Sequence, residues 1–206
     1  MQSIQGQRWS LPTCSAIISD DVVREALRPY LWREHQREPD TVIVEELGVC
    51  RGRVRIDIAV VNGLLHGYEI KSDRDSLRRL AAQITDYNRV FDMVTLVVGT
   101  RHLSQASRVV PPWWGVLTLI VDANGSQLDT VRPAQPNPQR DPRSLVELLW
   151  LGHAIALLEE HGTARGVRGK SRARVWDRIC ATLTVDEIGS AVRARLKERG
   201  RSESLR

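Results

Sequence analysis

Three charged residues interrupt two apolar segments that are predicted to be neighbouring strands. Asp57 lies inside the segment Arg53–Val61, and Glu69 and Lys71 lie near the end of the segment Leu64–Ser72. Strand interiors normally exclude charged side chains, because burying a charge without a partner is costly. Two adjacent strands can bring both carboxylates and the ammonium group to one point. We therefore expect a site at these three residues.

The register of the first hairpin selects a fourth acidic residue. Residues that lie directly opposite each other in an antiparallel pair share a face of the sheet. If Arg51-Gly52 forms a two-residue turn, Glu46 lies opposite Asp57, whereas Glu45 points to the other face. The pattern therefore favours Glu46 as the additional carboxylate.

The second hairpin needs a loop of three residues for the site to form. A two-residue turn at Asn62-Gly63 would place Tyr68 opposite Asp57 and would turn Glu69 away. A three-residue loop, with Gly63 at positive φ and a bulge, instead places Glu69 opposite Asp57. We expect the longer loop, and finding Asp57 and Glu69 on opposite faces of the sheet would contradict the site.

Carboxylates that converge need positive charge, because like charges at short range raise at least one pKa. Lys71 supplies one cation against three carboxylates. Mg²⁺, with Mn²⁺ as an alternative, suits carboxylate oxygens and water. Such an ion polarises a phosphate and lowers the pKa of bound water, and Lys71 would hold that water or the developing oxyanion. This chemistry predicts metal-assisted cleavage of phosphodiester bonds.

Hydrophobic spacing predicts a helix over residues 19–36 before the strands and a second helix over residues 76–91 after them. Pro29 should kink or shorten the first helix. Thr41–Cys50 is the first predicted strand, and the apolar runs Met93–Gly99 and Val116–Val121 are typical of buried strands. The order is helix, three strands, helix and strand, followed by one more strand, as in a mixed α/β protein.

The strand residues resemble the motif of the PD-(D/E)xK nuclease superfamily. That motif is an aspartate on one strand followed by Glu/Asp-x-Lys on the next, and Asp57 and Glu69-Ile70-Lys71 match it. Ile56 stands where the family name has proline. The resemblance covers about residues 20–100 and implies a restriction-endonuclease-like core.

The helix that follows strengthens this resemblance. Gln83-Ile-Thr-Asp-Tyr87 is similar to the QxxxY motif of the RecB-like branch. The spacing puts Gln83 and Tyr87 on one face of the helix, one turn apart. The combination is most similar to uncharacterised bacterial predicted nucleases.

The resemblance implies a role for each matched residue. Asp57 and Glu69 would bind the metal ion, with the Ile70 carbonyl as a further ligand. Lys71 would position or activate water. Gln83 and Tyr87 would complete the catalytic set and contact the nucleic acid backbone.

The remaining acidic ligand has two candidates. Register favours Glu46, which matches the family position loosely. Glu25 competes with it, because family members often carry this residue on the first helix.

These patterns predict an α/β protein with a restriction-endonuclease-like αβββαβ core, a mixed central sheet and a helical C-terminal extension. The nuclease-like domain would span residues 1–132, a proline-rich linker residues 133–142, and a basic helical region residues 143–206. Asp141-Pro142 is typical of a helix start. Leu145–His161 is a predicted apolar helix, and Thr184 and Glu187 form a capping box for a last helix.

Positive charge is concentrated in the last third of the chain. Residues 139–206 contain 14 basic and nine acidic residues, whereas the first 138 residues contain 16 of each. The basic stretch at residues 165–178 favours a nucleic acid partner, expected to be DNA, although a solvated loop would have the same composition.

The three cysteines form no zinc or disulfide pattern, and we find no signal peptide and no apolar segment of membrane-spanning length.

We therefore expect a cytoplasmic, Mg²⁺-dependent (deoxyribo)nuclease of the PD-(D/E)xK type, bacterial and active in DNA repair or defence. The alternative is a non-catalytic module on the same fold that binds nucleic acid or a protein. A protein-binding module would expose an apolar face on the helix Leu145–His161. Assembly into a homo-oligomer or with a partner protein is compatible with each of these functions, and no membrane partner is expected.

Overall fold

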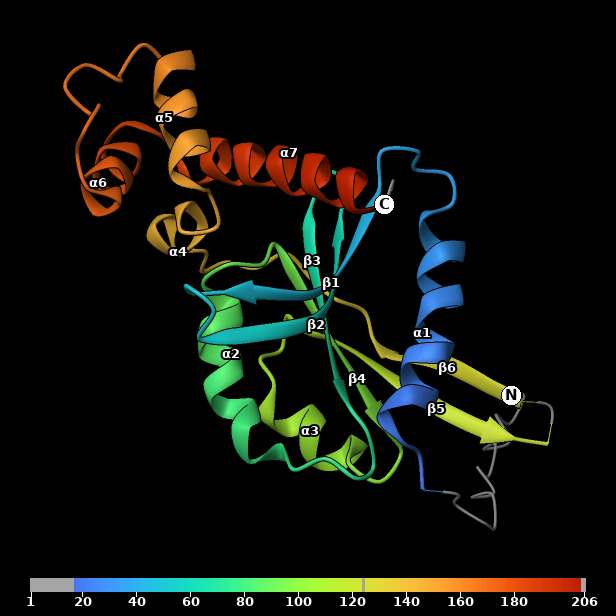
Figure 1. Ribbon diagram of the computed structural model, residues 1–206. Coiled ribbons are helices and arrows are strands. Elements are labelled where there is room, and N and C mark those ends of the chain that lie inside the picture. The colour runs from blue at the N-terminus through green and yellow to red at the C-terminus, as the bar shows by residue number, and fades with distance from the viewer. Residues whose placement is uncertain (1–16, 124, 205–206) are drawn as a thin grey trace, which may run out of the picture.

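The computed structural model describes residues 17–123 and 125–204, which form one six-stranded sheet with helices on both faces (Figure 1). The strands are β1 (Val42–Val49), β2 (Val54–Val61), β3 (Leu65–Lys71), β4 (Met93–Gly99), β5 (Gly115–Asp122) and β6 (Gly125–Arg132). The helices are α1 (Asp20–His35), the 3₁₀ helix η1 (Leu77–Arg79), α2 (Leu80–Asn88), α3 (Leu103–Val109), α4 (Pro142–Val146), α5 (Leu151–Glu160), α6 (Arg172–Thr182) and α7 (Val185–Ser204).

The sheet is mixed, as predicted. Its strands lie in the order β1-β2-β3-β4-β5-β6. The pairs β1–β2, β2–β3 and β5–β6 are antiparallel, whereas β3–β4 and β4–β5 are parallel. The two parallel connections pass through α2 and α3, because a parallel neighbour needs a crossover segment. The predicted α/β class is therefore confirmed.

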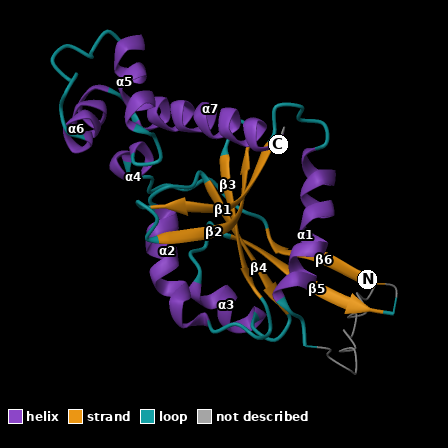
Figure 2. Cartoon of the chain, viewed as in Figure 1, coloured by secondary structure: helices purple, strands orange, loops and turns teal. Residues whose placement is uncertain are grey.

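Each face of the sheet has its own hydrophobic core. On one face, α1 buries Val23, Leu27 and Leu31 against strand residues such as Ile58 and Leu119. The other face forms the larger core, which contains buried residues of α2, α3 and the C-terminal helices. Figure 2 shows α1 on one side of the strands and α2 and α3 on the other. The first predicted helix is confirmed, and it continues past Pro29 without being shortened there.

Both predicted strand registers are confirmed. In β1–β2, Glu45 pairs with Ile58 and Leu47 pairs with Ile56, so Glu46 lies opposite Asp57. In β2–β3, Val61 pairs with Leu65, which leaves the three-residue loop that the site required.

The predicted geometry of that loop is wrong in one respect. Gly63 does not have a positive φ. Instead, the backbone N–H of Asn62 donates to the carbonyl of Leu64, and the Asn62 side chain accepts the N–H of Leu64 at 2.9 Å. The asparagine side chain thus closes the loop without a left-handed glycine.

The C-terminal region departs from the sequence prediction at its first helix. The predicted helix Leu145–His161 is divided into α4 and α5, which are separated by residues 147–150. Asp141 caps α4 by accepting the N–H of Ser144 at 2.9 Å. Leu149 and Leu158 of this region are buried, whereas Trp150 is 65 % exposed. Because Trp150 is the one large apolar side chain of this segment that is exposed, the continuous exposed apolar face expected of a protein-binding module is not found here.

The other end of the C-terminal region follows the prediction. Thr184 and Glu187 form the expected capping box, in which the Glu187 carboxylate accepts the N–H of Thr184 at 2.7 Å. Buried Asp92 anchors α7 to the sheet, because its carboxylate accepts the Leu65 N–H and also pairs with Arg193 at 3.0 Å. The division into a domain, a linker and a C-terminal region stays a prediction.

The sequence pattern did not predict α3 and β6. The residues of β6 are mostly exposed, so they lack the apolar alternation of a half-buried strand. No helix in the described part of the chain is long and apolar enough to cross a membrane.

Candidate functional site

The candidate site lies where β2 and β3 separate. The β2–β3 ladder ends at the pair Ile58 and Tyr68. One residue further, the Asp57 carboxylate accepts the backbone N–H of Ile70 at 2.7 Å. A side chain thus takes the place of the next ladder bond, which satisfies a buried backbone donor and holds the strands apart. We call this point the fork.

Glu69 lies at the centre of a second set of contacts at the fork. Its carboxylate is 2 % exposed and accepts hydrogen bonds from the Lys71 ammonium group and from the Gln83 amide, the latter at 2.6 Å. The Tyr87 hydroxyl lies 2.7 Å from the other oxygen of Glu69 and 2.6 Å from the Arg55 carbonyl. The structure therefore brings together Glu69, Lys71, Gln83 and Tyr87, as the sequence predicted.

Burial raises the pKa of the Tyr87 hydroxyl, and the nearby negative charge of Glu69 raises it further. The hydroxyl therefore keeps its proton and acts as a hydrogen-bond donor. It has one proton and two acceptors within reach, the Glu69 carboxylate and the Arg55 carbonyl. Tyr87 thus connects α2 to the end of β3 and to β2.

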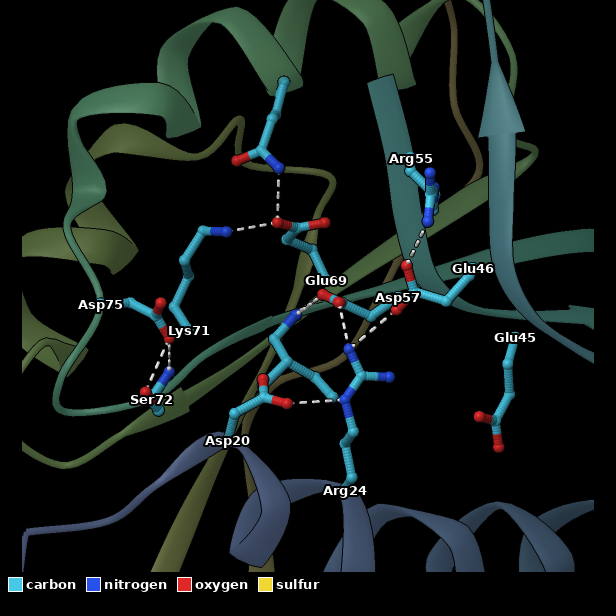
Figure 3. Close-up of polar contacts among 12 residues, drawn as sticks. Asp20, Arg24, Glu45, Glu46, Arg55, Asp57, Glu69, Lys71, Ser72 and Asp75 are labelled. Atoms are coloured by element: carbon cyan, nitrogen blue, oxygen red, sulfur yellow. Dashed lines mark hydrogen bonds and ion pairs between the residues drawn. The ribbon is translucent and has the colours of Figure 1, made fainter. Parts of the chain in front are cut away.

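Arg24 of α1 is part of the fork, although the sequence analysis did not identify it. Its guanidinium group contacts three carboxylates, those of Asp20 at 2.7 Å, Glu46 at 3.0 Å and Asp57 at 2.5 Å (Figure 3). The spacing of Asp20 and Arg24, four residues apart in a helix, was the available signal. The same spacing occurs on many solvated helix faces, and it does not indicate that Arg24 reaches the sheet.

The two carboxylates of the fork are held by groups from opposite layers of the protein. Arg24 of α1 holds Asp57, whereas Gln83 and Tyr87 of α2 hold Glu69. The carboxylates are close enough that the charge of Glu69 raises the pKa of Asp57. The predicted register is correct, but Asp57 reaches Arg24 on the α1 side of the sheet, whereas Glu69 reaches α2 on the other side. The two carboxylates therefore do not share a face, which contradicts the site as it was predicted from the sequence.

The environment of Asp57 changes the pKa of its carboxyl group. Burial, followed by the charge of Glu69, raises its pKa from 3.8 to about 6, although the Ile70 N–H and Arg24 act in the opposite direction. Loss of hydration disfavours the charged carboxylate more than its partners favour it. Keeping Asp57 charged in this buried position is therefore unfavourable, although Arg24 lies beside it.

The arrangement does not fit a metal ion while Arg24 is in place. In the described part of the chain, no three His, Cys, Asp or Glu side chains are grouped so that they could hold one. Glu46 shares Arg24 with Asp57, but it also pairs with Arg55 at 3.3 Å. Glu25, the competing candidate, lines a groove between α1 and β6 and is not at the fork. The N–H of Ile70, rather than its carbonyl, makes the contact with Asp57.

Comparison with known proteins gives a family match over most of the chain. The family described as bacteriophage P4 protein cII matches residues 19–205. Protein cII of Enterobacteria phage P4 is 34% identical over 101 residues, which are 49% of this chain and 38% of that protein. The aligned part thus spans well under half of that relative. No solved structure matches the chain.

These matches overturn the nuclease assignment made from the sequence. The family that covers the chain is that of a phage protein, not the PD-(D/E)xK superfamily, and no enzymatic family is indicated. The assignments as a Mg²⁺-dependent hydrolase and as a bacterial DNA repair or defence protein are wrong for the same reason. The described residues contain no cluster of side chains that could hold a metal ion, which agrees with this correction. The motif Asp57…Glu69-x-Lys71 with Gln83 and Tyr87 describes this fork well, but it did not identify the family.

Proposed function

The chain belongs to the family of bacteriophage P4 protein cII, and we propose that it binds nucleic acid through a basic lobe at one end of the molecule. The basic lobe consists of residues 162–171 and helix α6. Figure 1 shows α5, α6 and the loop between them projecting beyond one end of α7, away from the sheet. A projecting surface of this kind is accessible to a large, extended partner.

The observation that carries the proposal is the exposed positive charge of this lobe. Its basic residues are all exposed, and the single acidic residue between residues 162 and 178 is Asp177. The basic residues are Arg165, Arg168, Lys170, Arg172, Arg174 and Arg178. This local excess of five positive charges equals the net charge of the whole chain. Such a concentration attracts a phosphate backbone and releases counterions on binding.

The packing of α6 explains why these charges face outward. Val175, Trp176 and Ile179 are buried on the inner side of the helix. The guanidinium of Arg143 in α4 lies 5.2 Å from the Trp176 ring centroid, and that of Arg172 lies 5.7 Å from it. The contact with Arg143 holds α6 on α4, whereas the contact with Arg172 lies within α6 itself. The charged side of α6 is therefore presented on a rigid support.

Most of these cations are available for phosphate. Arg168 pairs with Glu159 at 2.8 Å, and Asp177 pairs with Arg143 outside the lobe. In the part of the chain that the structure describes, Arg165, Lys170 and Arg174 make no ion pair with an acidic side chain. These three side chains are the best candidates for direct phosphate contacts.

Fluorescence anisotropy tests the proposal. It measures the binding of labelled DNA and RNA fragments over a range of salt concentrations. The triple variant Arg165→Ala, Lys170→Ala, Arg174→Ala should weaken binding and lower the salt slope by about 2–3, because each phosphate contact contributes roughly 0.7–0.9. The matched control is Arg101→Ala with Arg108→Ala, two exposed arginines beside and within α3. Binding that is independent of salt, or equal losses in both variants, would contradict the proposal.

The finer description of the fold also remains our inference. We infer that α1, β1, β2, β3, α2 and β4 form the restriction-endonuclease-like αβββαβ core, which their order along the chain supports. A shared fold does not carry an activity, because function depends on the particular site. The inference therefore adds no catalytic role.

Binding of Mg²⁺ or Mn²⁺ stays a prediction, and it applies to a state in which Arg24 has left Asp57. The sharing of Arg24 by Asp57 and Glu46 supports it, because both carboxylates would lose this cation together. Arg24→Gln should then show a larger metal-induced rise in melting temperature than the unmodified chain. Equal, negligible shifts in both proteins would remove the cofactor prediction.

A further inference from the structure

The two edges of the sheet differ in how well they are protected. At one edge, α7 lies so close to β1 that a Cβ on Gly200 would be 2.3 Å from Val42 Cγ1. The β1 backbone is also irregular at Glu46, which has a φ of 54°. Irregular and covered edges resist pairing with another chain. At the other edge, β6 pairs with β5 alone among the described strands.

Strand β6 has only some of the features that prevent edge-to-edge pairing. It is eight residues long and contains neither lysine nor proline, although it carries Asp129, Arg132 and a register shift near its end. Its regular part is Gly125–Thr130, because the register with β5 shifts after Thr130. Ser126, Gln127 and Thr130 are exposed, whereas Leu128 is half-buried against the core beneath α1. No other described strand pairs with the outer edge of this regular part, which carries Leu128 as its apolar side chain; Val131 beyond it is 50 % exposed.

The sequence of this strand is complementary to itself. In antiparallel pairing of two copies centred on Leu128, the two Leu128 side chains lie opposite each other. Gln127 then lies opposite Asp129 of the second copy, which pairs an amide donor with a carboxylate. Ser126 lies opposite Thr130 of the second copy, which pairs two hydroxyl groups. Pairs of these kinds stabilise antiparallel strands.

Neighbouring registers are less favourable. A twofold axis perpendicular to the sheet keeps every side chain on its own face, so the pairing must centre on a residue. Centring on Asp129 would place two carboxylates directly opposite each other, which is destabilising. Centring on Gln127 would place Leu128 opposite Ser126, and centring on Thr130 would place Asp129 opposite Val131. The pairing centred on Leu128 is the best match.

The groove beside this edge gives room for the second strand. It is an open groove of about 690 Å³, lined by Ser126–Leu128 and by one face of α1 that carries Glu25, Arg33 and Glu34 beside Ala26 and Tyr30. Leu128 of a second copy would lie beside Leu128, at the apolar part of this groove. Apolar contact across an added strand, together with main-chain hydrogen bonds, is how sheet edges recruit partners.

We propose that the chain forms a symmetric dimer in which β6 pairs antiparallel with β6 of a second copy, centred on Leu128. The two six-stranded sheets then form one continuous sheet. The basic lobe lies far from β6 (Figure 1), so this dimer leaves the nucleic-acid surface of both copies open. The dimer does not depend on the proposed nucleic-acid binding.

Sedimentation velocity over a range of concentrations and a disulfide trap together test the dimer. The trap uses the full chain with Cys14, Cys50 and Cys180 replaced by serine. In that background, Leu128→Cys places two thiols opposite each other across the twofold axis, within reach of a disulfide. Mild oxidation should convert Leu128→Cys to a covalent dimer at least ten times faster than the matched control Thr130→Cys, whose thiols would be offset along the strands.

A third variant separates loss of pairing from loss of folding. Leu128→Asp should remain folded by circular dichroism, because Leu128 is half-buried, but it should sediment as a monomer. A monomer at all concentrations for the unmodified chain would overturn the proposal. So would equal trapping rates at Leu128 and Thr130, or a dimer that Leu128→Asp leaves intact.

Discussion

Replacing Asp57 with asparagine should change the pH dependence of stability in a direction that follows from the fork. The pKa of Asp57 rises from 3.8 to about 6 on folding, so the folded state holds the proton more tightly than the unfolded state. The stabilisation is complete below about pH 3.8 and is lost as pH rises through about 6. A shift of about two pKa units corresponds to about 3 kcal/mol, of which roughly half falls between pH 5 and 8.

Asp57→Asn removes the titration and keeps an oxygen that can accept the Ile70 N–H. The free energy of unfolding, measured by urea denaturation with a chelator present, should therefore fall between pH 5 and 8 by about 1 kcal/mol less in the variant than in the unmodified chain. The control variant Asp21→Asn removes an exposed carboxylate at the start of α1 instead. Parallel curves for Asp57→Asn and the unmodified chain would refute a raised pKa at the fork.

Three further substitutions test contacts that hold the fold together. Tyr87→Phe should lower stability by about 1–3 kcal/mol, because buried Glu69 loses a donor, and chemical denaturation measures the loss. Gly99→Ala should be destabilising by about 1–3 kcal/mol, because the added Cβ would lie 2.2 Å from Asp73 Oδ1, and an unchanged melting temperature would show that Asp73 moves freely. Thr184→Ala should cost about 1 kcal/mol through loss of the α7 cap, with serine at this position restoring most of it.

Much of the sheet could be predicted from the sequence because strand side chains alternate. A register that is wrong by one residue moves every side chain to the other face. Few registers of the two hairpins therefore place Asp57 opposite Glu69. The observed registers of both hairpins follow from that constraint. The capping box at Thr184 was predictable for a similar reason, since its contacts depend on four consecutive residues.

Elements that depend on distant partners were harder to predict. The helix Leu145–His161 looked continuous because its apolar residues recur without interruption, yet the chain turns between α4 and α5 to pack both against α6. Strand β6 carries too few apolar residues to be recognised, and it forms because β5 supplies its hydrogen-bond partners. In both cases the deciding contacts come from segments that the local pattern does not contain.

The sequence by itself indicated that Asp57, Glu69, Lys71, Gln83 and Tyr87 lie near one another, because their types and spacing along two strands and one helix are local properties. It did not show that Asp57 and Glu69 turn to opposite sides of the sheet. Only the tertiary structure showed that Arg24 is also present, because α1 packs across the sheet and brings its guanidinium group to Asp57 at 2.5 Å. Whether a carboxylate meets an arginine or is free for a metal ion depends on such packing, and so the motif alone could not decide the chemistry of this site.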